Sequence, residues 1–446
     1  MATKKDLVEA QSFAKRRLTT AFVAGAPGGR EVEPNNPLKA IIGGVALSVV
    51  LILGSLAFGW FKSSLPDDWG NDRLVIAKQS GARYVSIKKV LHPVINTTSA
   101  RLLIPANNFK VITVDDEKLA SATRGATLGI LGAPDSLTPA DQLVNSGWVS
   151  CAGVGGAVGT AIGPSITSTP ATDQAAVVTN EGQTWVVSAG RRHPVPEAQV
   201  SAVLIALALD REQPREVPAK WLNLFAAAPA LSAVQIPDLG KPMPDLPPGA
   251  SVGSVLVVGS GEQTRRYLVN PAGHIEPLPE VAHALYRLGS GSGAQDISVQ
   301  PAQVSFLKVD TQQLTPTTWP STIPAPVEAA PCATLATTSG KAPTVLLSTS
   351  DDVKPPTTGS RTKVDNGHGS LVRAVGAGGT TAGPVFAIDQ TATAYAIPGG
   401  SPEILARLGY RADQVTAVQA EWMELFSPGP ALDPAAAQTV IVAGTK

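Results

Sequence analysis

The hydrophobic positions of this chain form one long uninterrupted run near the N-terminus, followed by many short segments. Residues 40–61, AIIGGVALSVVLILGSLAFGWF, contain no charged side chain. A helix of this length, at about 1.5 Å per residue, spans the hydrocarbon core of a bilayer. The run is too long, and starts too far into the chain, for a cleaved signal peptide. It predicts a transmembrane helix with Trp60 and Lys62 at its interfacial end.

A helical pattern precedes this run, in LVEAQSFAKRRLTTAFV within residues 1–39. Leu7, Leu18 and Phe22 fall along one stripe of the expected helix, with a basic cluster beside it. Such a basic amphipathic helix either lies on anionic lipid or docks on a cytoplasmic partner, although a helix that is merely solvated would show the same pattern. We expect the cytoplasmic partner contact to use Lys15, Arg16, Arg17, Leu18 and Phe22.

Beyond residue 62 the apolar positions come in short alternating segments. RYVSI, TWVVS, RYLVN and VFAID are β-branched or aromatic, as strands are, and each opens a stretch of roughly fifty residues. WLNLFAAAPAL begins at Trp221 and WMELFSPGPAL at Trp422, 201 positions later, and Trp, Leu, Phe, Pro, Ala and Leu recur in both. Self-similarity at a fixed spacing is the signature of a repeat architecture. We expect both tryptophans in the core of four α/β repeat units at 73–125, 183–231, 265–312 and 383–432.

The spacing of the units indicates an internal duplication. The first and third units are offset by 183 residues, the second and fourth by 201, and the two cysteines, Cys151 and Cys332, by 181. The cysteines thus occupy matching places in two linkers, which we expect to form a central domain joined by a disulfide. The two central linkers cover 126–182 and 313–382. The remaining segments are a linker between the halves at 232–264, which could act as a hinge, and a C-terminal tail at 433–446.

Composition and charge fit an exported region of the α+β class. The chain is 43% hydrophobic and contains 42 Gly and 38 Pro, which favours a sizeable core with many turns. Its net charge of zero hides an asymmetry, because residues 1–39 carry seven basic and four acidic side chains and the rest is acidic. Positive charge stays in the cytoplasm, so residues 62–446 are expected outside. An oxidising exterior makes a disulfide plausible there.

The sequence offers little for catalysis. Gly340 and Lys341 lack the Ser or Thr of a phosphate-binding loop, since Ala342 follows them, and the glycine run at 152–163 lacks the dinucleotide-binding spacing. We interpret that run as a flexible loop. The five histidines form no zinc motif, and His92 and His193 precede prolines in equivalent turns, which favours a structural role. We therefore expect no enzyme activity, no cofactor, no metal and no nucleic-acid partner.

The chain resembles EccB, the single-span core component of the type VII (ESX) secretion machinery of actinobacteria, over nearly its full length. The resemblance rests on AQSFAKRRLTTAFV before the membrane, SGARYVSIKKVLHPVINTTSARLL in the first repeat, TRGATLGILGAPDSL after it, GHGSLVRA ahead of the last repeat, and the final SPGPALDPAAA. The Arg-rich stretch that the family carries after its first helix is short here, ending in GAPGGREVEPNNP.

The resemblance implies an elongated, quasi-twofold exported region with four repeats around a mainly-β central domain that is crossed by a disulfide matching Cys151 and Cys332. It also implies an inner-membrane assembly with an EccC-type ATPase, EccD, EccE and other EccB copies, with the mycosin protease nearby. The resemblance further implies repeats similar in fold to a cell-wall-binding module of a phage lysin. The candidate functions are a structural subunit, a peptidoglycan-binding envelope module, or an exported hydrolase or NTPase. ATPase activity has been suggested for the family, but no nucleotide motif supports it in this chain.

Overall fold

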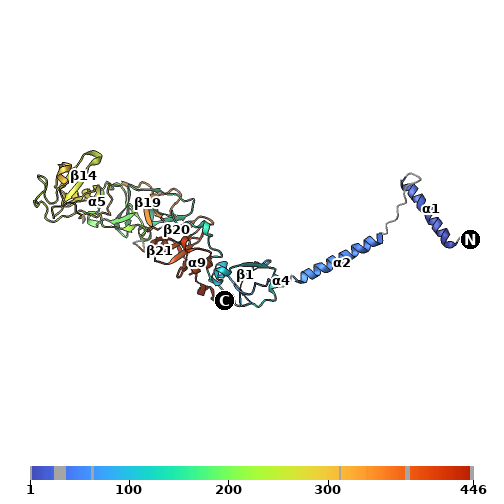
Figure 1. Cartoon of the computed structure of the whole chain (residues 1–446). Coiled ribbons are helices and arrows are strands. Elements are labelled where there is room, and N and C mark those ends of the chain that lie inside the picture. The colour runs from blue at the N-terminus through green and yellow to red at the C-terminus, as the bar shows by residue number, and fades with distance from the viewer. Residues whose placement is uncertain are drawn as a thin grey trace. The chain divides into compact units, whose positions relative to one another are not determined.

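The computed structural model describes residues 3–24, 37–61, 65–310, 313–338, 340–376 and 382–441. The chain divides into two compact units, Met1–Pro66 and Asp67–Lys446. Among the described residues of the first unit are the helices α1 (Lys4–Ala24) and α2 (Pro37–Phe61) (Figure 1). The N-terminus of α1 is capped by Asp6, whose Oδ2 accepts hydrogen bonds from the backbone nitrogen (2.9 Å) and Oγ1 (2.6 Å) of Thr3.

Helix α2 contains the predicted membrane span. Its segment Leu38–Leu56 has a mean hydropathy of 2.1 and is, among the described residues, the one helix stretch long and apolar enough to cross a membrane. None of this segment is buried against the protein, as expected for a surface that lipid covers. The side chain of Trp60 and the whole of Lys62, predicted at the interfacial end, lie outside the described residues.

The second unit contains four repeats with one topology. In each, three antiparallel strands are followed by a helix, a fourth strand and a short helix, and the fourth strand pairs in parallel with the first. The first repeat consists of β1 (Arg73–Ala77), β2 (Arg83–Ile87), β3 (Val90–Pro93), α3 (Thr97–Leu103), β4 (Val111–Val114) and α4 (Asp116–Leu119). Its sheet has the order β3-β2-β1-β4.

The other three repeats keep this order, and two of them gain an edge strand. The second consists of β8 (Gln174–Asn180), β9 (Gln183–Ser188), β10 (Arg191–Pro194), α5 (Val200–Ala206), β11 (Arg215–Glu216), α6 (Ala219–Leu222) and β12 (Ala226–Ala227). The third consists of β13 (Val255–Val258), β14 (Arg265–Val269), β15 (Ile275–Pro277), α7 (Glu280–Leu288), β16 (Asp296–Val299) and α8 (Pro301–Val304). The fourth consists of β21 (Ser370–Val375), β22 (Val385–Ile388), β23 (Thr393–Ile397), α9 (Pro402–Leu408), β24 (Thr416–Gln419), the 3-10 helix η7 (Ala420–Leu425) and β25 (Ser427–Pro428).

Three of the expected repeat boundaries need correction. The second, third and fourth repeats were expected to begin at residues 183, 265 and 383, but their first strands β8, β13 and β21 precede those positions. The predicted boundaries place these strands in the central segments and in the 232–264 linker. The second strand of each repeat carries an aromatic residue that marks it in the sequence, and the first strands share no such residue.

The two central segments, one from each half of the chain, together form a separate six-stranded sheet. Its order is β20-β6-β5-β18-β19-β7, in which β5 (Val149–Ala152), β6 (Val158–Ile162) and β7 (Thr169–Pro170) come from the first central segment and β18 (Cys332–Ala336), β19 (Thr344–Thr349) and β20 (Ser360–Val364) from the second. The glycine run interpreted as a flexible loop in fact contains the fully buried strand β6. Gly159 is required in it, because a Cβ there would lie 2.9 Å from the Cα of Pro355.

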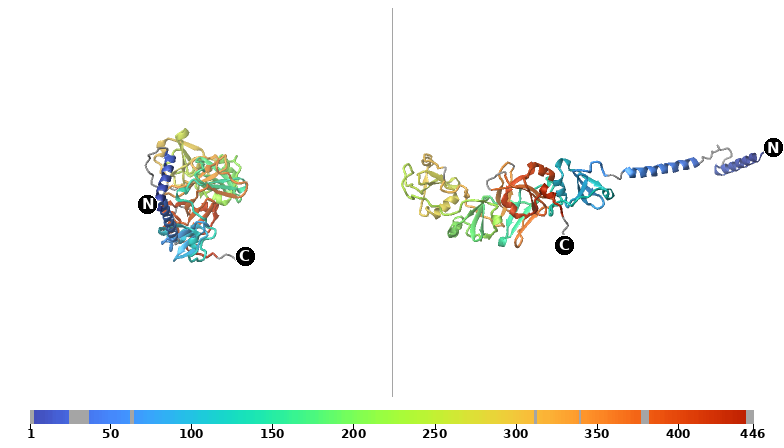
Figure 2. Two further views of the ribbon diagram at one scale, coloured as in Figure 1. Left: turned by 90° about the vertical axis from the view of Figure 1, so that its right-hand side faces the viewer. Right: turned by 90° about the horizontal axis from the view of Figure 1, so that it is seen from below.

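The repeats pack in two pairs, the first with the fourth and the second with the third (Figure 2). Helix α3 of the first repeat contacts α9 of the fourth, and Leu102 shares a core with Leu405. Helix α5 of the second repeat contacts α7 of the third, where Leu204 and Leu285 share another core. Pairing first with fourth and second with third is the arrangement that an approximate twofold axis between the duplicated halves produces.

The 232–264 linker does not have the character of a hinge. Val234 and Ile236 are buried within the core shared by the second and third repeats, and β13 belongs to the third sheet. The backbone nitrogen of Val234 also donates a 3.1 Å hydrogen bond to the carbonyl of Leu285. Buried apolar anchors of this kind fix a segment, because opening it would expose them to water.

Candidate functional site

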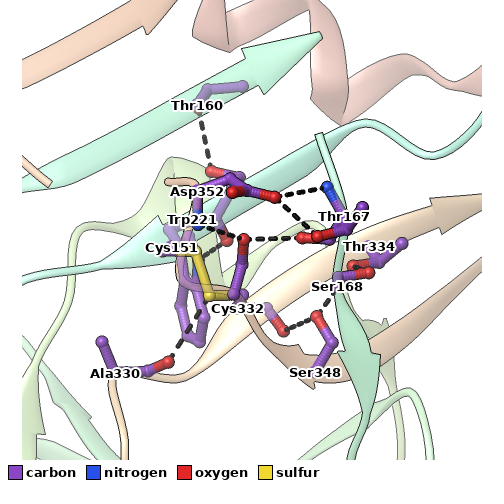
Figure 3. The surroundings of a disulfide bond; sticks show 12 residues. Cys151, Thr160, Thr167, Ser168, Trp221, Ala330, Cys332, Thr334, Ser348 and Asp352 are labelled. Atoms are coloured by element: carbon purple, nitrogen blue, oxygen red, sulfur yellow. Dashed lines mark hydrogen bonds between the residues drawn. A yellow bond between two sulfur atoms is a disulfide. The ribbon is translucent and has the colours of Figure 1, made fainter. Parts of the chain in front are cut away.

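The two cysteines lie directly opposite each other at the centre of the six-stranded sheet that the two central segments form together. Cys151 in β5 and Cys332 in β18 are paired residues of an antiparallel ladder, 3.9 Å apart between Cα atoms, and their sulfurs form a disulfide (Figure 3). Both residues are fully buried. The bond closes a sequence separation of 181 residues and ties the two halves of the duplication together, as the sequence predicted.

The register of this ladder pairs residues that occupy matching positions in the two halves of the duplication. The cysteines are equivalent residues of the two halves and also partners of each other, so an approximate twofold axis passes between them. The hairpins β5–β6 and β18–β19 extend the sheet on either side. The disulfide therefore stands at the symmetry centre of the module, where one covalent bond constrains both halves.

Polar side chains around the disulfide connect the two central segments further. Asp352 accepts hydrogen bonds from the backbone nitrogen (2.9 Å) and Oγ1 (2.6 Å) of Thr167, which lower the pKa of its carboxyl (Figure 3). Asp365 accepts from Oγ of Ser165 at 2.6 Å. Two carboxylates of the second segment thus hold one loop of the first.

Three tryptophans pack against this sheet. Trp148, Trp221 and Trp422 are fully buried in one cluster, so the second and fourth repeats both contribute to the central core. The rings of Trp148 and Trp422 meet edge to face with centroids 5.7 Å apart. The structure confirms the prediction that the repeated tryptophans are core residues.

Four of the five predicted cytoplasmic contact residues lie on or beside one apolar stripe of α1, and the fifth, Arg16, does not. Leu18 is 66% exposed and Phe22 90% exposed, on the same side of the helix. Successive helical residues are about 100° apart, so Lys15 and Arg17 flank the apolar stripe on its two sides and Arg16 lies on the opposite face. The expected cluster of three basic residues beside the stripe is therefore a pair plus one outlying arginine.

The two repeat histidines bind backbone. Nδ1 of His92 lies 3.0 Å from the carbonyl oxygen of Ala126, and Nδ1 of His193 lies 3.0 Å from that of Pro229. His193 is fully buried, which lowers the pKa of its imidazole. A Cβ on Gly125 would come within 2.3 Å of the His92 ring, so this glycine makes room for the contact. Each histidine thus fastens the end of its repeat to the third strand.

A hollow of about 450 Å³, which sequence reasoning missed, is lined by the 132–139 loop and by residues of the fourth repeat. Asp389 at its wall is 8% exposed. Its Oδ1 accepts from the backbone nitrogens of Thr391 (2.9 Å) and Thr393 (3.1 Å), and its Oδ2 accepts from the hydroxyl of Tyr395 at 3.2 Å. The carboxylate is therefore engaged in organising the turn between β22 and β23.

These features define a class: proteins with one apolar N-terminal helix followed by a mainly-β region of duplicated repeats around a disulfide-linked sheet. The family described as type VII secretion system ESX-1, transport TM domain B, matches residues 1–442. The chain belongs to this family, the EccB family.

Individual relatives agree. The chain is 29% identical over 437 residues to the ESX-3 secretion system ATPase EccB3 of Mycolicibacterium smegmatis, covering 88% of this chain and 82% of the relative. It is 29% identical over 303 residues to the ESX-5 secretion system ATPase EccB5 of Mycobacterium tuberculosis, covering 63% and 58% of the two chains.

Solved structures show the same fold. The structure of an EccB3 dimer from the ESX-3 core complex matches with a TM-score of 0.67 at 28% identity, over 82% of this chain and 99% of that chain. A chain of an intact ESX-5 inner membrane complex matches with a TM-score of 0.66 at 21% identity, over 100% and 97% of the two chains.

Proposed function

We propose that this chain is a structural subunit of a type VII secretion membrane complex, anchored by α2 and organising the complex outside the membrane. The observation that carries the proposal is family membership over residues 1–442, which includes the apolar helix as well as the repeats. The disulfide and the paired repeat cores support a rigid structural role, because they join segments from both halves of the exported region.

The proposed topology places α1 in the cytoplasm and residues 62–446 on the periplasmic side of the inner membrane. The excess of Lys and Arg before α2 supports this orientation. A buried disulfide in the region after α2 fits an oxidising compartment.

The proposed partners are other copies of this chain, an EccC-type ATPase, EccD and EccE, with a mycosin protease nearby. The similarity to a chain of an EccB3 dimer supports contacts between copies. On the cytoplasmic side, we propose that Leu18 and Phe22 contact an apolar groove of a neighbouring subunit while Lys15 and Arg17 bind acidic groups at its rims.

The relatives carry "ATPase" in their names, but our proposal contains no catalytic step. Gly340 and Lys341 are followed by Ala342, where a phosphate-binding loop needs a hydroxyl. The purified chain should leave ATP intact. Hydrolysis that co-purifies with the chain and is lost when Lys341 is replaced by Ala would contradict the non-enzymatic proposal.

Secretion by the producing cell tests the function. Deletion of the gene should stop export of type VII substrates, and the full chain should restore it. A chain that begins at Pro37 should insert into the membrane and yet fail to restore export, because it lacks α1. Normal export in the deletion strain would remove the basis of the proposal.

A further inference from the structure

The turn between β2 and β3 of the first repeat has an unusual composition. Lys88 and Lys89 form a two-residue hairpin loop with φ values of 49° and 62°. Loops of this kind favour Asn and Gly, because most side chains are strained at positive φ. The equivalent turn of the second repeat uses Ala189 and Gly190. The first repeat therefore has two lysines where the second repeat has a small residue and a glycine.

The lysine turn is fastened to the segment that leads from α2. The backbone nitrogen of Lys89 donates to the carbonyl oxygen of Gly70 at 2.7 Å, and that of Lys88 donates to Oδ1 of Asn71 at 2.5 Å. A Cβ on Gly70 would lie 3.1 Å from Cγ of Lys89, so the lysine stem passes directly over this glycine. The turn cannot move away from residues 70–71 without losing these contacts.

Chain length limits how far this turn can be from the membrane. Gly70 follows Phe61, the last residue of α2, by nine positions. A fully extended chain spans at most about 3.3–3.6 Å per residue, so Gly70 lies within roughly 30 Å of the end of α2. Trp69, which precedes it, is partly exposed, and tryptophan is enriched at membrane interfaces.

The other charges at this end of the sheet are largely engaged with one another. Asp68 lies 3.1 Å from Nζ of Lys110 and 3.5 Å from Nε of Arg73, and Asp72 accepts a 3.0 Å hydrogen bond from Asn108. Asp67 is exposed beside them. Within the described part of the chain, no ion pair involves Lys88 or Lys89, and both are exposed. Their ammonium groups are available to an external anion.

We propose that Lys88 and Lys89 bind the phosphate groups of anionic lipids at the membrane surface from which α2 emerges, so that the first repeat rests on that surface. Two lysines at a tethered hairpin tip fit a lipid headgroup layer, which offers many phosphates near the anchor point. The proposal goes beyond the secretion role and requires only that α2 spans the bilayer.

Amine labelling of the full chain in nanodiscs tests this contact. Lys88 and Lys89 should react about fivefold more slowly with an amine reagent in phosphatidylglycerol discs than in phosphatidylcholine discs. Salt near 1 M should remove the difference, because it screens surface charges. Exposed Lys354 in the central domain serves as the internal reference. Inorganic phosphate added to phosphatidylcholine discs should give no protection. Equal labelling in both lipids, or protection by free phosphate alone, would overturn the proposal.

A photoactivatable phosphatidylglycerol analogue provides a second readout with a matched variant. It should crosslink the peptide containing residues 83–93 as well as α2. Replacing the turn by the residues of the second repeat, Lys88→Ala with Lys89→Gly, should remove the first crosslink and keep the second, since the turn geometry is retained. Persistence of the 83–93 crosslink in this variant would contradict the proposal. Absence of crosslinks in α2 would show instead that the membrane span is wrong.

Discussion

Trp221 and Trp422 occupy equivalent positions of the second and fourth repeats and are both fully buried, yet their indole nitrogens have different surroundings. Nε1 of Trp221 donates a 2.9 Å hydrogen bond to the carbonyl oxygen of Ser150 in β5. Among the described atoms, Nε1 of Trp422 has no hydrogen-bond partner. The duplication is therefore symmetric in packing but not in hydrogen bonding.

This asymmetry predicts unequal effects of one substitution. Trp221→Phe should destabilise the protein by about 1 kcal/mol more than Trp422→Phe, because it removes a buried hydrogen bond, whereas Trp422→Phe removes an N–H group that has no partner among the described atoms. The two variants are matched controls for each other, and unfolding midpoints of the detergent-solubilised chain measure the difference. Equal midpoints would show that the hydrogen bond contributes nothing.

The disulfide predicts a loss of stability on reduction. Closing a loop of 181 residues stabilises by about 5 kcal/mol in the chain-entropy model, and Cys151→Ala with Cys332→Ala should therefore lower the unfolding midpoint markedly. Mass spectrometry of the unreduced protein should recover the two cysteine peptides as one species. Two free thiols in exported protein would contradict the proposed location.

Burial of His193 predicts a pH dependence. Its pKa in the folded protein is below the unfolded value of about 6.5, so the unfolded state binds the proton first. Stability from this group is fully present above about pH 6.5 and decreases as the pH falls towards the folded pKa. His193→Asn should flatten the stability curve between pH 7 and 5, whereas His368→Asn, a control outside the core, should not. Parallel curves for both variants would contradict the prediction.

The geometry of α1 predicts different outcomes for neighbouring arginines. Arg17→Glu should weaken the membrane complex and secretion, because Arg17 flanks the Leu18 and Phe22 stripe. Arg16→Glu changes the charge equally on the opposite face and should have a smaller effect. Blue-native gels at equal protein level compare the two variants. Equal loss from both would indicate that total charge before α2, rather than a contact, is what matters.

Residue-level sequence patterns revealed those parts of the fold that leave a local signal. The charge-free run gave α2, the repeated tryptophans gave the core of the second and fourth repeats, and matching linkers gave the cysteine pair. The first strands of the later repeats were missed, because β8, β13 and β21 carry no residue in common that an ungapped comparison can align.

The remaining misses concern contacts between distant segments. Nothing near Val234 and Ile236 indicates that two repeats bury them together, so the 232–264 segment looked like a hinge. Gly159 looked like part of a flexible loop, although it is the close approach of Pro355 that requires it. The lysine turn was overlooked as well, since the importance of Lys88 and Lys89 depends on hydrogen bonds to residues 70–71.

Affinity purification from detergent-solubilised membranes tests the central claim most directly. A tag at the N-terminus of the chain should recover a large complex that contains further copies of the chain, the EccC-type ATPase, EccD and EccE, identified by native mass and by mass spectrometry of the components. Recovery of the chain by itself, together with binding of its exported region to purified cell wall, would contradict a structural role in secretion and would indicate an envelope-binding module instead.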